Sequence, residues 1–501
     1  MNHFSPGALD ILWLPLIPLI AVAVGAVVVL LAGVRVSDDD SEGLGWIALA
    51  FLGAALLFTL PLIGQSSGTA FAGAIAIDNY AAYFEIAVIL TAAVTVLMSL
   101  EYAPDFGLAG AEYYSLLLFA ALGMMLMAAA SDLIVVFLGL ETMSIAVYVL
   151  SGLMRQDPRS NEAAMKYFVL GAFSTGFLLY GIALVYGATA TIKLAPIAAA
   201  LAGAKSGNPL LLAGLGLLLV GFGFKVAAVP FHMWTPDVYE GAPTPVTAFM
   251  AVGIKLGAFA AFVRIFLVYF GAAATHWNQV LWVIAALTMT TGNLVALVQG
   301  NIKRMLAYSA IAHAGYVLVG MTAAGAQAGS AVLFYLLAYA FTNLGAFSVV
   351  AALERRGERR DAIADYRGLA LTHPGLAALM VIFLLSLTGV PPLAGFVGKF
   401  YVFSAALNAG YVWLTIIAVL NSVVSAYYYL SVVVVMYMTE GEARPVAVQA
   451  QPGMVAALAV SLIGTVMIGI YPGPYMGAAS SAFKSALSHT QVSSQPLKLR
   501  G

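Results

Sequence analysis

Seven ionisable side chains lie inside long apolar stretches of this sequence, where bulk water is not expected to solvate their charges. They are one carboxylate, four lysines and two histidines: Glu141, Lys166, Lys225, His232, Lys255, His313 and Lys399. A charge at the centre of a bilayer costs about 2.5–3.5 kcal/mol on insertion scales, so residues kept there usually have a partner and a function. Lysine, histidine and carboxylate groups together can pass protons near neutral pH.

The stretch FKVAAVPFHMWTPDVYEGAP, residues 224–243, gathers several polar groups between two long apolar runs. Burial favours the neutral form of a lysine, and a nearby carboxylate favours the charged form. Glu141 near Lys225 would therefore hold the lysine charged until the carboxylate moved or took up a proton. Sites for Na⁺ or K⁺ would show several carboxylates and carbonyls. Four lysines thus argue against a cation passing through and favour a proton relay.

Simpler roles are open for some of these residues. Lys166 could extend its ammonium to the cytoplasmic face, His313 could be a satisfied packing residue, and His232 could brace a broken backbone. Glu141 could serve only as a counter-ion, although that role would still set the pKa of a lysine.

Other acidic residues are interpreted as structural. Glu85 is expected to pack or pair locally, and Asp132, with Ser131, is expected to begin a helix. Asp237 and Glu240 are expected to lie toward the cytoplasmic end and face water.

The composition defines the environment of these groups. The chain has 501 residues, 62% of them hydrophobic and 9% charged, with a mean hydropathy of +0.99. Soluble domains carry about 25% charged residues, so we expect a polytopic membrane protein. Apolar segments of about 18–25 residues favour helices over barrel strands, so the fold class is all-α.

Two further counts exclude classes of function. The sequence contains no cysteine, which excludes disulfides, thiolate-held iron–sulfur clusters and Cys-ligated zinc. We therefore expect no metal site, cofactor site or redox site in this chain. The net charge of −1 gives no basic surface for nucleic acid.

The apolar segments predict about fourteen transmembrane helices. The expected ranges are 11–34, 44–63, 80–100, 112–130, 132–153, 162–187, 209–239, 244–270, 279–299, 303–323, 328–352, 375–408, 411–438 and 453–472. The first has no Lys or Arg before it, so we expect a retained helix and not a cleaved signal. The segment 190–205 is too short to span and is expected to form a lateral or surface helix.

The seventh and twelfth helices are expected to be broken by proline, at Pro230 and at Pro391 and Pro392, each beside a lysine. Because the breaks lie five helices apart, the two units have opposite topology, and paired broken helices mark ion paths in transporters. The alternative is that proline is merely tolerated in membrane helices. The expected organisation is three N-terminal helices (1–110), a first inverted repeat (111–270), a second inverted repeat (275–440), and a last helix with a tail (441–501).

The basic residues predict an orientation. Eleven of the 21 Lys and Arg follow odd-numbered helices: Arg35, Arg155, Arg159, Lys303, Arg304, Arg355, Arg356, Arg359, Arg360, Arg367 and Arg444. Cytoplasmic loops carry an excess of Lys and Arg, so both termini are expected on the outer, periplasmic side. After even-numbered helices stand only Lys193 and Lys205, with Arg264 near the end of the eighth, and three basic residues of the tail run weakly against the rule.

Three stretches together give a resemblance to a known family: residues 224–243, NIKRMLAYSAIAHAGY at 301–316, and GVPPLAGFVGKF at 389–400. They resemble the antiporter-like membrane subunits of proton-pumping NADH:quinone oxidoreductase, respiratory complex I. The N-type subunit, the bacterial counterpart of mitochondrial NADH dehydrogenase subunit 2, is the most similar. The M-type carries glutamate where Lys399 stands, and the L-type has a long lateral C-terminal helix for which the tail after about residue 475 is too short.

The resemblance implies a fold of fourteen helices, two five-helix inverted repeats and a central polar axis. It implies that Glu141 and Lys225 form a pair, that Lys255 bridges, that His313 relays and that Lys399 ends the chain of groups. Lys166 matches a lysine of the sixth helix in the family.

The resemblance also implies a setting. Protons would move through the relay while NADH, FMN, iron–sulfur clusters and quinone are handled by other subunits. The partners would be the M-type subunit, the small K- and J-type subunits and lipid, in a bacterial inner membrane. Two alternatives are a subunit of a multi-subunit cation/proton antiporter and a structural spacer that does not conduct.

Overall fold

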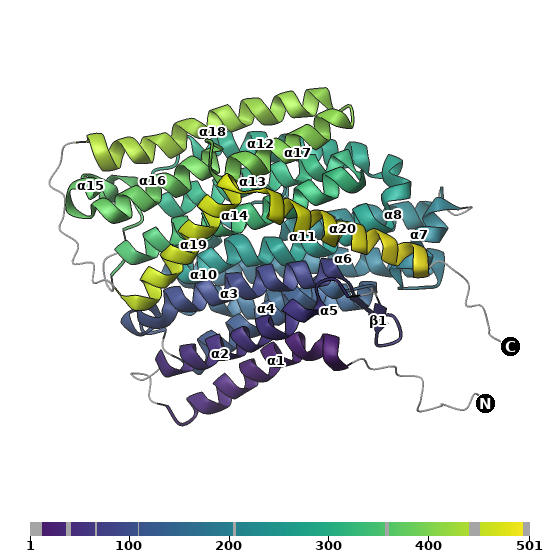
Figure 1. Ribbon diagram of the computed structural model, residues 1–501, viewed down its shortest axis with the longest axis horizontal. Helices are drawn as coiled ribbons and strands as arrows, with labels where there is room; N and C mark the ends of the chain where they lie inside the picture. The colour runs from purple at the N-terminus through teal and green to yellow at the C-terminus, as the bar shows by residue number, and fades with distance from the viewer. Residues whose placement is uncertain are drawn as a thin grey trace.

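The chain folds as a bundle of long helices that run side by side (Figure 1). The computed structural model describes residues 13–36, 42–65, 68–108, 110–203, 207–355, 360–439 and 451–493. Within these ranges, twelve helical segments are long and apolar enough to cross a membrane. Two shorter apolar helices, α8 (Pro209–Lys225) and α16 (Pro374–Thr388), precede breaks in the chain. The expectation of about fourteen spans is therefore confirmed.

The uninterrupted spans begin and end within a few residues of the predicted bounds. They are α1 (Trp13–Gly33), α2 (Glu42–Thr59, extended by the 3-10 turn η3, Leu60–Leu62), α3 (Asn79–Asp105), α4 (Ala111–Ala129), α5 (Leu133–Ser151), α6 (Pro158–Thr189), the segment Thr244–Tyr269, α12 (Asn278–Ala296), α13 (Ile302–Ala323), α14 (Gly325–Leu353), α18 (Val412–Met438) and α19 (Pro452–Ile470). Several begin at a capping side chain. The Asp132 carboxylate accepts a hydrogen bond from the backbone N–H of Ile134 at 2.8 Å, so its predicted role at the start of α5 is confirmed.

Both predicted breaks are present. After α8 the chain passes Pro230 and resumes as α9 (Thr235–Gly241). After α16 it passes Pro391 and Pro392 and resumes as α17 (Ala394–Asn408). Proline has no backbone N–H to donate, and its ring clashes with the preceding turn of a helix. The breaks thus leave backbone groups of α8 and α16 free to bond to side chains.

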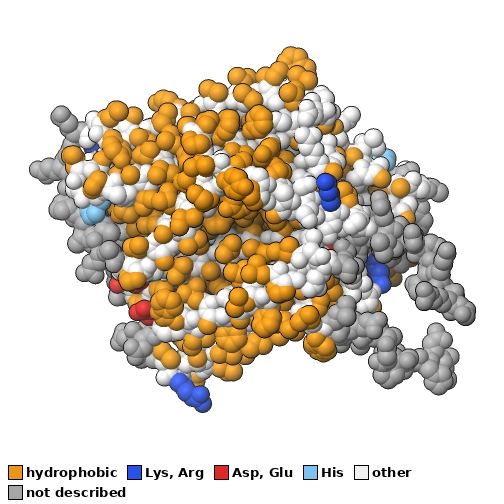
Figure 2. Space-filling view, viewed as in Figure 1, with side chains coloured by type: hydrophobic (Ala, Val, Ile, Leu, Met, Phe, Trp, Pro, Cys, Tyr) orange, Lys and Arg blue, Asp and Glu red, His pale blue; other side chains and the backbone are white. Residues whose placement is uncertain are grey.

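The centre of the bundle is formed by α13, α14 and the segment Thr244–Tyr269, which is buried along its whole length. That segment alternates between α10 (Thr244–Phe249), the π-helical turn η4 (Met250–Ile254), α11 (Lys255–Val263) and a second π-helical turn, η5 (Arg264–Tyr269). The peripheral helices α1, α2 and α18 instead expose large apolar side chains. Figure 2 shows hydrophobic side chains over most of the face in view, as expected where a helix bundle meets lipid.

Several short elements complete the fold. The helix α7 (Leu194–Ala202) confirms the short helix expected within 190–205. The antiparallel pair β1 (Gly68–Ala70) and β2 (Ile75–Ile77) was not predicted, because three-residue strands leave little periodic signal. The other short helices are η6 (Gly271–His276), η7 (Ile363–Tyr366) and α15 (Leu369–Thr372).

The tail contains a further helix that the sequence did not predict, α20 (Gly473–Ser493), which packs against α3 and α14 (Figure 1). Its buried residues recur at helical spacing, with Ala479, Ala482, Phe483 and Ala486 on one face. The ring of Phe483 lies against Gly329 of α14, where an added Cβ would come within 2.2 Å of it.

Candidate functional site

Lys225 is a buried ammonium held by hydroxyl groups. It is the last residue of α8, and its Nζ donates to Ser144 Oγ at 2.7 Å and to Tyr148 OH at 3.1 Å, both on α5. The same Nζ lies 5.3 Å from the centre of the Tyr148 ring. Neutral hydroxyls and ring faces can hold the charged lysine. Because a hydroxyl can also donate a hydrogen bond, the neutral amine finds partners here as well as the charged ammonium.

Glu141 does not form the expected ion pair with Lys225 in this structure. Its Oε1 accepts a hydrogen bond from Thr175 Oγ1 of α6 at 2.8 Å, and the side chain is only half-buried. Ser144, one helical turn farther along α5, is the residue that contacts the lysine. Glu141 and Lys225 therefore make no direct contact here, because Glu141 faces α6 and the less buried side of α5, although the carboxylate still acts on the lysine electrostatically.

Lys255 lies at the centre of the molecule, where the π-helical turn η4 gives way to α11. It is buried, donates a hydrogen bond to the backbone carbonyl of Ala310 in α13, and its Nζ lies 5.6 Å from the centre of the Tyr339 ring. Single π-helical turns occur frequently at functional sites. Here the turn directly precedes the lysine.

His313, in the middle of α13, is contacted through both ring nitrogens. Its Nδ1 is 2.7 Å from Tyr335 OH and its Nε2 is 3.2 Å from Tyr429 OH. His313, Tyr335, Tyr339 and Ser386 help to line a cavity of about 10 Å³, close to the volume that one water molecule needs. A histidine with a hydroxyl at each nitrogen can take a proton on one side and release it on the other.

Lys399, in α17, binds a backbone carbonyl that the second break leaves free. Its Nζ donates to the backbone carbonyl of Thr388 and to Ser422 Oγ, each at 2.8 Å. Thr388 is the last residue of α16, so its carbonyl is free to accept because the helix stops there. The Nζ also lies 4.9 Å from the centre of the Tyr316 ring.

Three of the predicted relay residues thus lie in one polar tract, which we define as Lys255, Tyr339, His313, Tyr316 and Lys399. The ring of His313 is 5.2 Å from that of Tyr339 and 5.5 Å from that of Tyr316, measured between centroids. These two rings in turn face the two lysines. Lys225 lies outside these direct contacts, with its own partners on α5.

The tyrosines and serines of this site were not predicted from the sequence. The signal was present in α14, where Tyr335 and Tyr339 stand four residues apart in an otherwise apolar helix. Among 24 tyrosines in the chain, spacing alone does not distinguish those that meet a lysine from those that only pack.

The two residues proposed as possible relay members lie apart from the tract. Lys166 is 40% exposed and pairs with Asp237 at 2.5 Å and with Glu162 at 2.7 Å. His232 lies half-buried in the first break, and among the described residues no hydrogen bond joins it to a relay lysine.

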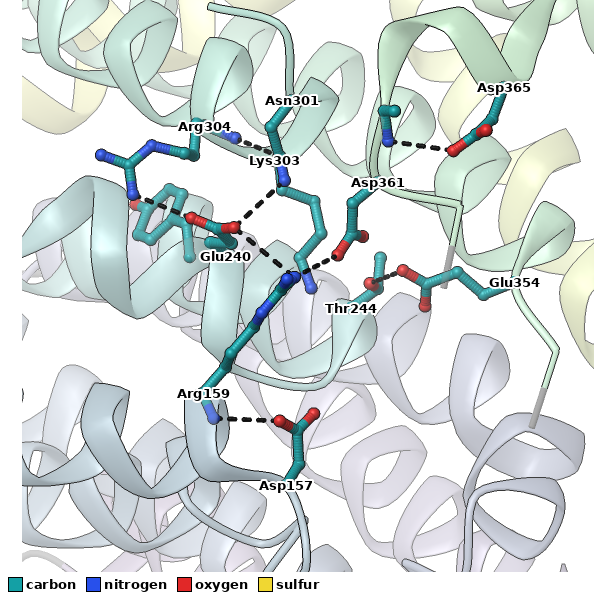
Figure 3. A network of polar contacts seen from close by, with 12 residues as sticks. Asp157, Arg159, Glu240, Thr244, Asn301, Lys303, Arg304, Glu354, Asp361 and Asp365 are labelled. Carbon is teal, nitrogen blue, oxygen red and sulfur yellow. Dashed lines mark hydrogen bonds and ion pairs between the residues drawn. The ribbon is translucent and has the colours of Figure 1, made fainter. Parts of the chain in front are cut away.

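A second polar region lies at the end of the bundle where α6, α9 and α13 meet (Figure 3). Arg304 Nη1 contacts Asp237 Oδ1 and Glu240 Oε2, each at 2.8 Å. These carboxylates were expected to face water. They are instead partly buried ion-pair partners, since the arginine of α13 reaches across to α9.

The same region gathers basic residues that were predicted to share one side of the membrane. Arg159 lies 3.7 Å from Glu240 and 3.9 Å from Asp361, and Lys303 Nζ donates to the Ala242 carbonyl at 2.7 Å. Several residues of the orientation argument lie outside the described residues: Lys205, Arg356, Arg359, Arg444, Lys498 and Arg500.

Glu354 is a buried carboxyl of this region, directly after α14. It accepts hydrogen bonds from Tyr102 OH and from Thr244 Oγ1, each at 2.7 Å. Burial raises the pKa of Glu354 above its ordinary value, and the nearby ammonium of Lys303 opposes that rise.

A Glu354→Gln variant is expected to change the dependence of stability on pH. A raised pKa in the folded state contributes stability below the unfolded value of about 4.3, and the contribution is lost as pH rises through the higher folded value. Between these two pKa values, the melting temperature of the wild type should fall with rising pH. Glutamine does not ionise, so the variant should lack this part of the fall. Thermal melts of the purified protein across this range measure the difference. Glu112→Gln, at an exposed carboxylate, should keep the wild-type profile; a Glu354→Gln profile parallel to wild type would contradict the assignment.

Within the described residues, no group of three or more His, Asp or Glu could hold a metal ion. In the part of the chain that the structure describes, twelve membrane-length helices, two shorter apolar helices that end at breaks, buried lysines and a central histidine define an antiporter-like membrane protein.

The chain belongs to the NADH:quinone oxidoreductase/Mrp antiporter transmembrane family, whose model matches residues 130–425. A protein of Trichlorobacter lovleyi named NADH-quinone oxidoreductase subunit N is 48% identical over 94% of this chain and 96% of its own length. A protein of the same name from Chloroflexus aggregans is 47% identical over 92% of this chain and 94% of its own length.

Solved structures agree with this membership. A chain of respiratory complex I from Thermus thermophilus is 36% identical, with a TM-score of 0.79 over 93% of this chain and 99% of that one. A chain of the Mrp complex from Dietzia sp. DQ12-45-1b is 23% identical, with a TM-score of 0.82 over 96% of this chain and 98% of that one. The latter likeness concerns the fold alone.

Proposed function

We propose that this chain is an N-type membrane-arm subunit of a proton-translocating NADH:quinone oxidoreductase, and that it moves protons through its buried lysines and histidine. The observation that carries the proposal is the polar tract from Lys255 to Lys399, built in the centre of an apolar bundle. A buried lysine without a carboxylate in contact gains little from remaining charged. Such a lysine suits a proton carrier better than a structural ion pair.

In this proposal the relay consists of Glu141, Lys225, Lys255, His313 and Lys399. Ser144 and Tyr148 hold Lys225, while Tyr339 and Tyr316 flank the histidine on the sides of Lys255 and Lys399. Hydroxyl groups both donate and accept hydrogen bonds, so they can link carriers without holding a net charge. Glu141 lies one helical turn along α5 from Ser144, which holds Lys225, and from there its charge would influence the lysine.

The two broken helices would belong to inverted repeats at 111–270 and 275–440, after an N-terminal unit at 1–110 and before the closing segment 441–501. Lys225 ends the helix before the first break, whereas Lys399 lies in the helix after the second. The two breaks lie five spans apart, and this odd number supports opposite topology. The network of Figure 3 would face the cytoplasm, and both termini the periplasm, in a bacterial inner membrane.

The chemistry of NADH oxidation would belong to other subunits, which would carry FMN, iron–sulfur clusters and quinone. The absence of cysteine fits a chain that has no iron–sulfur ligands of this kind. Neighbouring chains in the membrane arm would be the M-type subunit and the small K- and J-type subunits.

A multi-subunit cation/proton antiporter is the second candidate, favoured by the family's second member and by the fold shared with an Mrp complex. Purification of the tagged chain from its native membrane distinguishes the two. Co-purification with NADH-oxidising subunits, and proton uptake into vesicles driven by NADH, supports the proposal. Cation/proton exchange without any response to NADH would replace it with the antiporter.

A further inference from the structure

A buried carboxyl, Glu85, lies outside the tract and has no role in it. It stands in α3 of the N-terminal unit and is 3% exposed, and its Oε2 is buried without a hydrogen-bond partner. A buried polar atom without a partner carries a large cost of desolvation. Glu85 was expected to pack or to pair locally; its burial agrees with packing, whereas Oε2 has no pairing partner.

The positive charge that acts on Glu85, that of Arg264, is already neutralised. Arg264 of η5 binds Asp78 through two hydrogen bonds, Nη1 to Oδ2 at 2.7 Å and Nη2 to Oδ1 at 2.8 Å. Its Nε donates to the carbonyl of Ala128 at 2.9 Å, and its guanidinium lies over the ring of Tyr80. Both side chains of this ion pair are buried. An ionised Glu85 would add a second carboxylate beside a guanidinium that serves one already.

Glu85 and Asp78 face the same cavity. They are seven residues apart, close to two turns, and so lie on one side of α3. The cavity has a volume of about 20 Å³, enough for one water molecule. It is lined on the remaining sides by α1, by Gln65, by strand β2 and by Ala129 of α4. Glu85 of α3, Gln65 in the chain after η3, and Asp78 just before α3 are polar, and they can supply the two to four hydrogen bonds that a buried water needs.

We propose that this cavity is a proton-binding site, in which Glu85 is a neutral carboxylic acid that exchanges its proton with a water bound beside it. On release, the O–H bond at Oε2 breaks, the electron pair stays on the carboxylate, and the water becomes hydronium. Asp78 and Arg264 are the charged groups that act electrostatically on Glu85. Asp78 lines the cavity, and the elements α1, α4 and β2 contribute only uncharged side chains to the lining.

The site is separate from the central tract, since none of its lining residues belongs to the tract. It lies at the end of the bundle where β2 precedes α3, whereas the residues of Figure 3 lie at the other end, where α13 begins and α14 ends. The inference rests on the proposed function only for its direction: under the proposed orientation, the cavity exchanges protons with the outer, periplasmic side.

Infrared spectroscopy of the assembled complex in vesicles tests the site. A protonated buried carboxyl gives a C=O stretching band that glutamine lacks. Glu85→Gln should abolish one such band, and Glu112→Gln, at an exposed carboxylate, should leave it in place. Raising the pH on the hairpin side of the membrane should weaken the band several-fold, and raising it on the other side should not.

A cavity-filling variant keeps the test decisive if Glu85→Gln fails to assemble. Ala82 lines the cavity, so Ala82→Val should displace the water and slow the response of the band to pH at least about tenfold. Ala93→Val, on a partly exposed face of the same helix, should respond at the wild-type rate.

Three results would overturn the proposal: no band that depends on Glu85, a band insensitive to pH on either side, or a band controlled by Na⁺ instead of pH. Lys225→Ala separates this inference from the proposed function. The Glu85 band should persist in Lys225→Ala membranes even where proton pumping is lost. If pumping proves unrelated to the chain but the band is present, the proton site stands and the function falls.

Discussion

Lys225→Ala is expected to lower the rate of NADH-driven proton uptake by at least about tenfold, which corresponds to about 1.4 kcal/mol in the barrier for proton transfer. Lys225 ends α8 directly before the first break. It is buried, and its Nζ donates to two hydroxyls, Ser144 Oγ and Tyr148 OH. Removing the amine leaves these hydroxyls without an ionisable partner. Proton uptake by vesicles, measured together with NADH oxidation, gives the rate.

Lys225→Arg separates a proton carrier from a fixed charge. Arginine keeps a positive charge but does not release its proton at physiological pH, so this variant should also fail to pump. If arginine restored pumping while alanine abolished it, Lys225 would act as a fixed charge. Lys484→Ala, at an exposed lysine of α20, controls for assembly and should pump at the wild-type rate. Full pumping by assembled Lys225→Ala would remove this lysine from the relay.

The membrane spans could be predicted from the sequence because the bilayer imposes a length on each helix and each helix satisfies its own backbone. The breaks were equally accessible, since proline removes an N–H wherever it stands. Pro230, Pro391 and Pro392 therefore located both interruptions correctly. The polar tail was harder to interpret, because α20 buries mainly alanines along one face and has no long apolar run.

Within the site, the identity of the ionisable residues was predictable and their partners were not. A lysine in an apolar run is conspicuous in any sequence, whereas the hydroxyls that hold it lie on other helices. Tyr148 is 77 residues from Lys225 along the chain, and Tyr429 is 116 residues from His313. The lack of a direct contact between Glu141 and Lys225 has the same origin, because the position of a carboxylate on α5 does not show whether it turns toward α8 or toward α6.

Arg264 illustrates the limit most clearly. The sequence placed it near the end of the eighth helix, among the few basic residues on the expected outer side. The structure buries it and joins it to Asp78, 186 residues away. No local pattern connects the two positions, since the contact depends on how α3 packs beside η5.

Arg264→Met is expected to destabilise the protein by about 3–5 kcal/mol, because it leaves the Asp78 carboxylate buried without its counter-ion. Combining it with Asp78→Asn should recover part of this loss. Asparagine removes the stranded charge and still offers a side-chain oxygen to the backbone N–H of Ala81, which Asp78 now caps at 2.8 Å. Denaturant titration in detergent of the wild type, both single variants and the double variant gives the coupling energy between the two side chains.

The size of that coupling decides between a buried ion pair that maintains the fold and one that is only tolerated. Arg159→Met is the matched control, since Arg159 is 58% exposed and its carboxylates lie 3.7 and 3.9 Å away. Exposed pairs of this kind contribute about 0–1 kcal/mol. If Arg264→Met were no more costly than Arg159→Met, Asp78 would have to be neutral in the folded protein. The Glu85 cavity would then contain two protonated carboxyls beside an uncompensated arginine, which the bidentate geometry of Arg264 and Asp78 argues against.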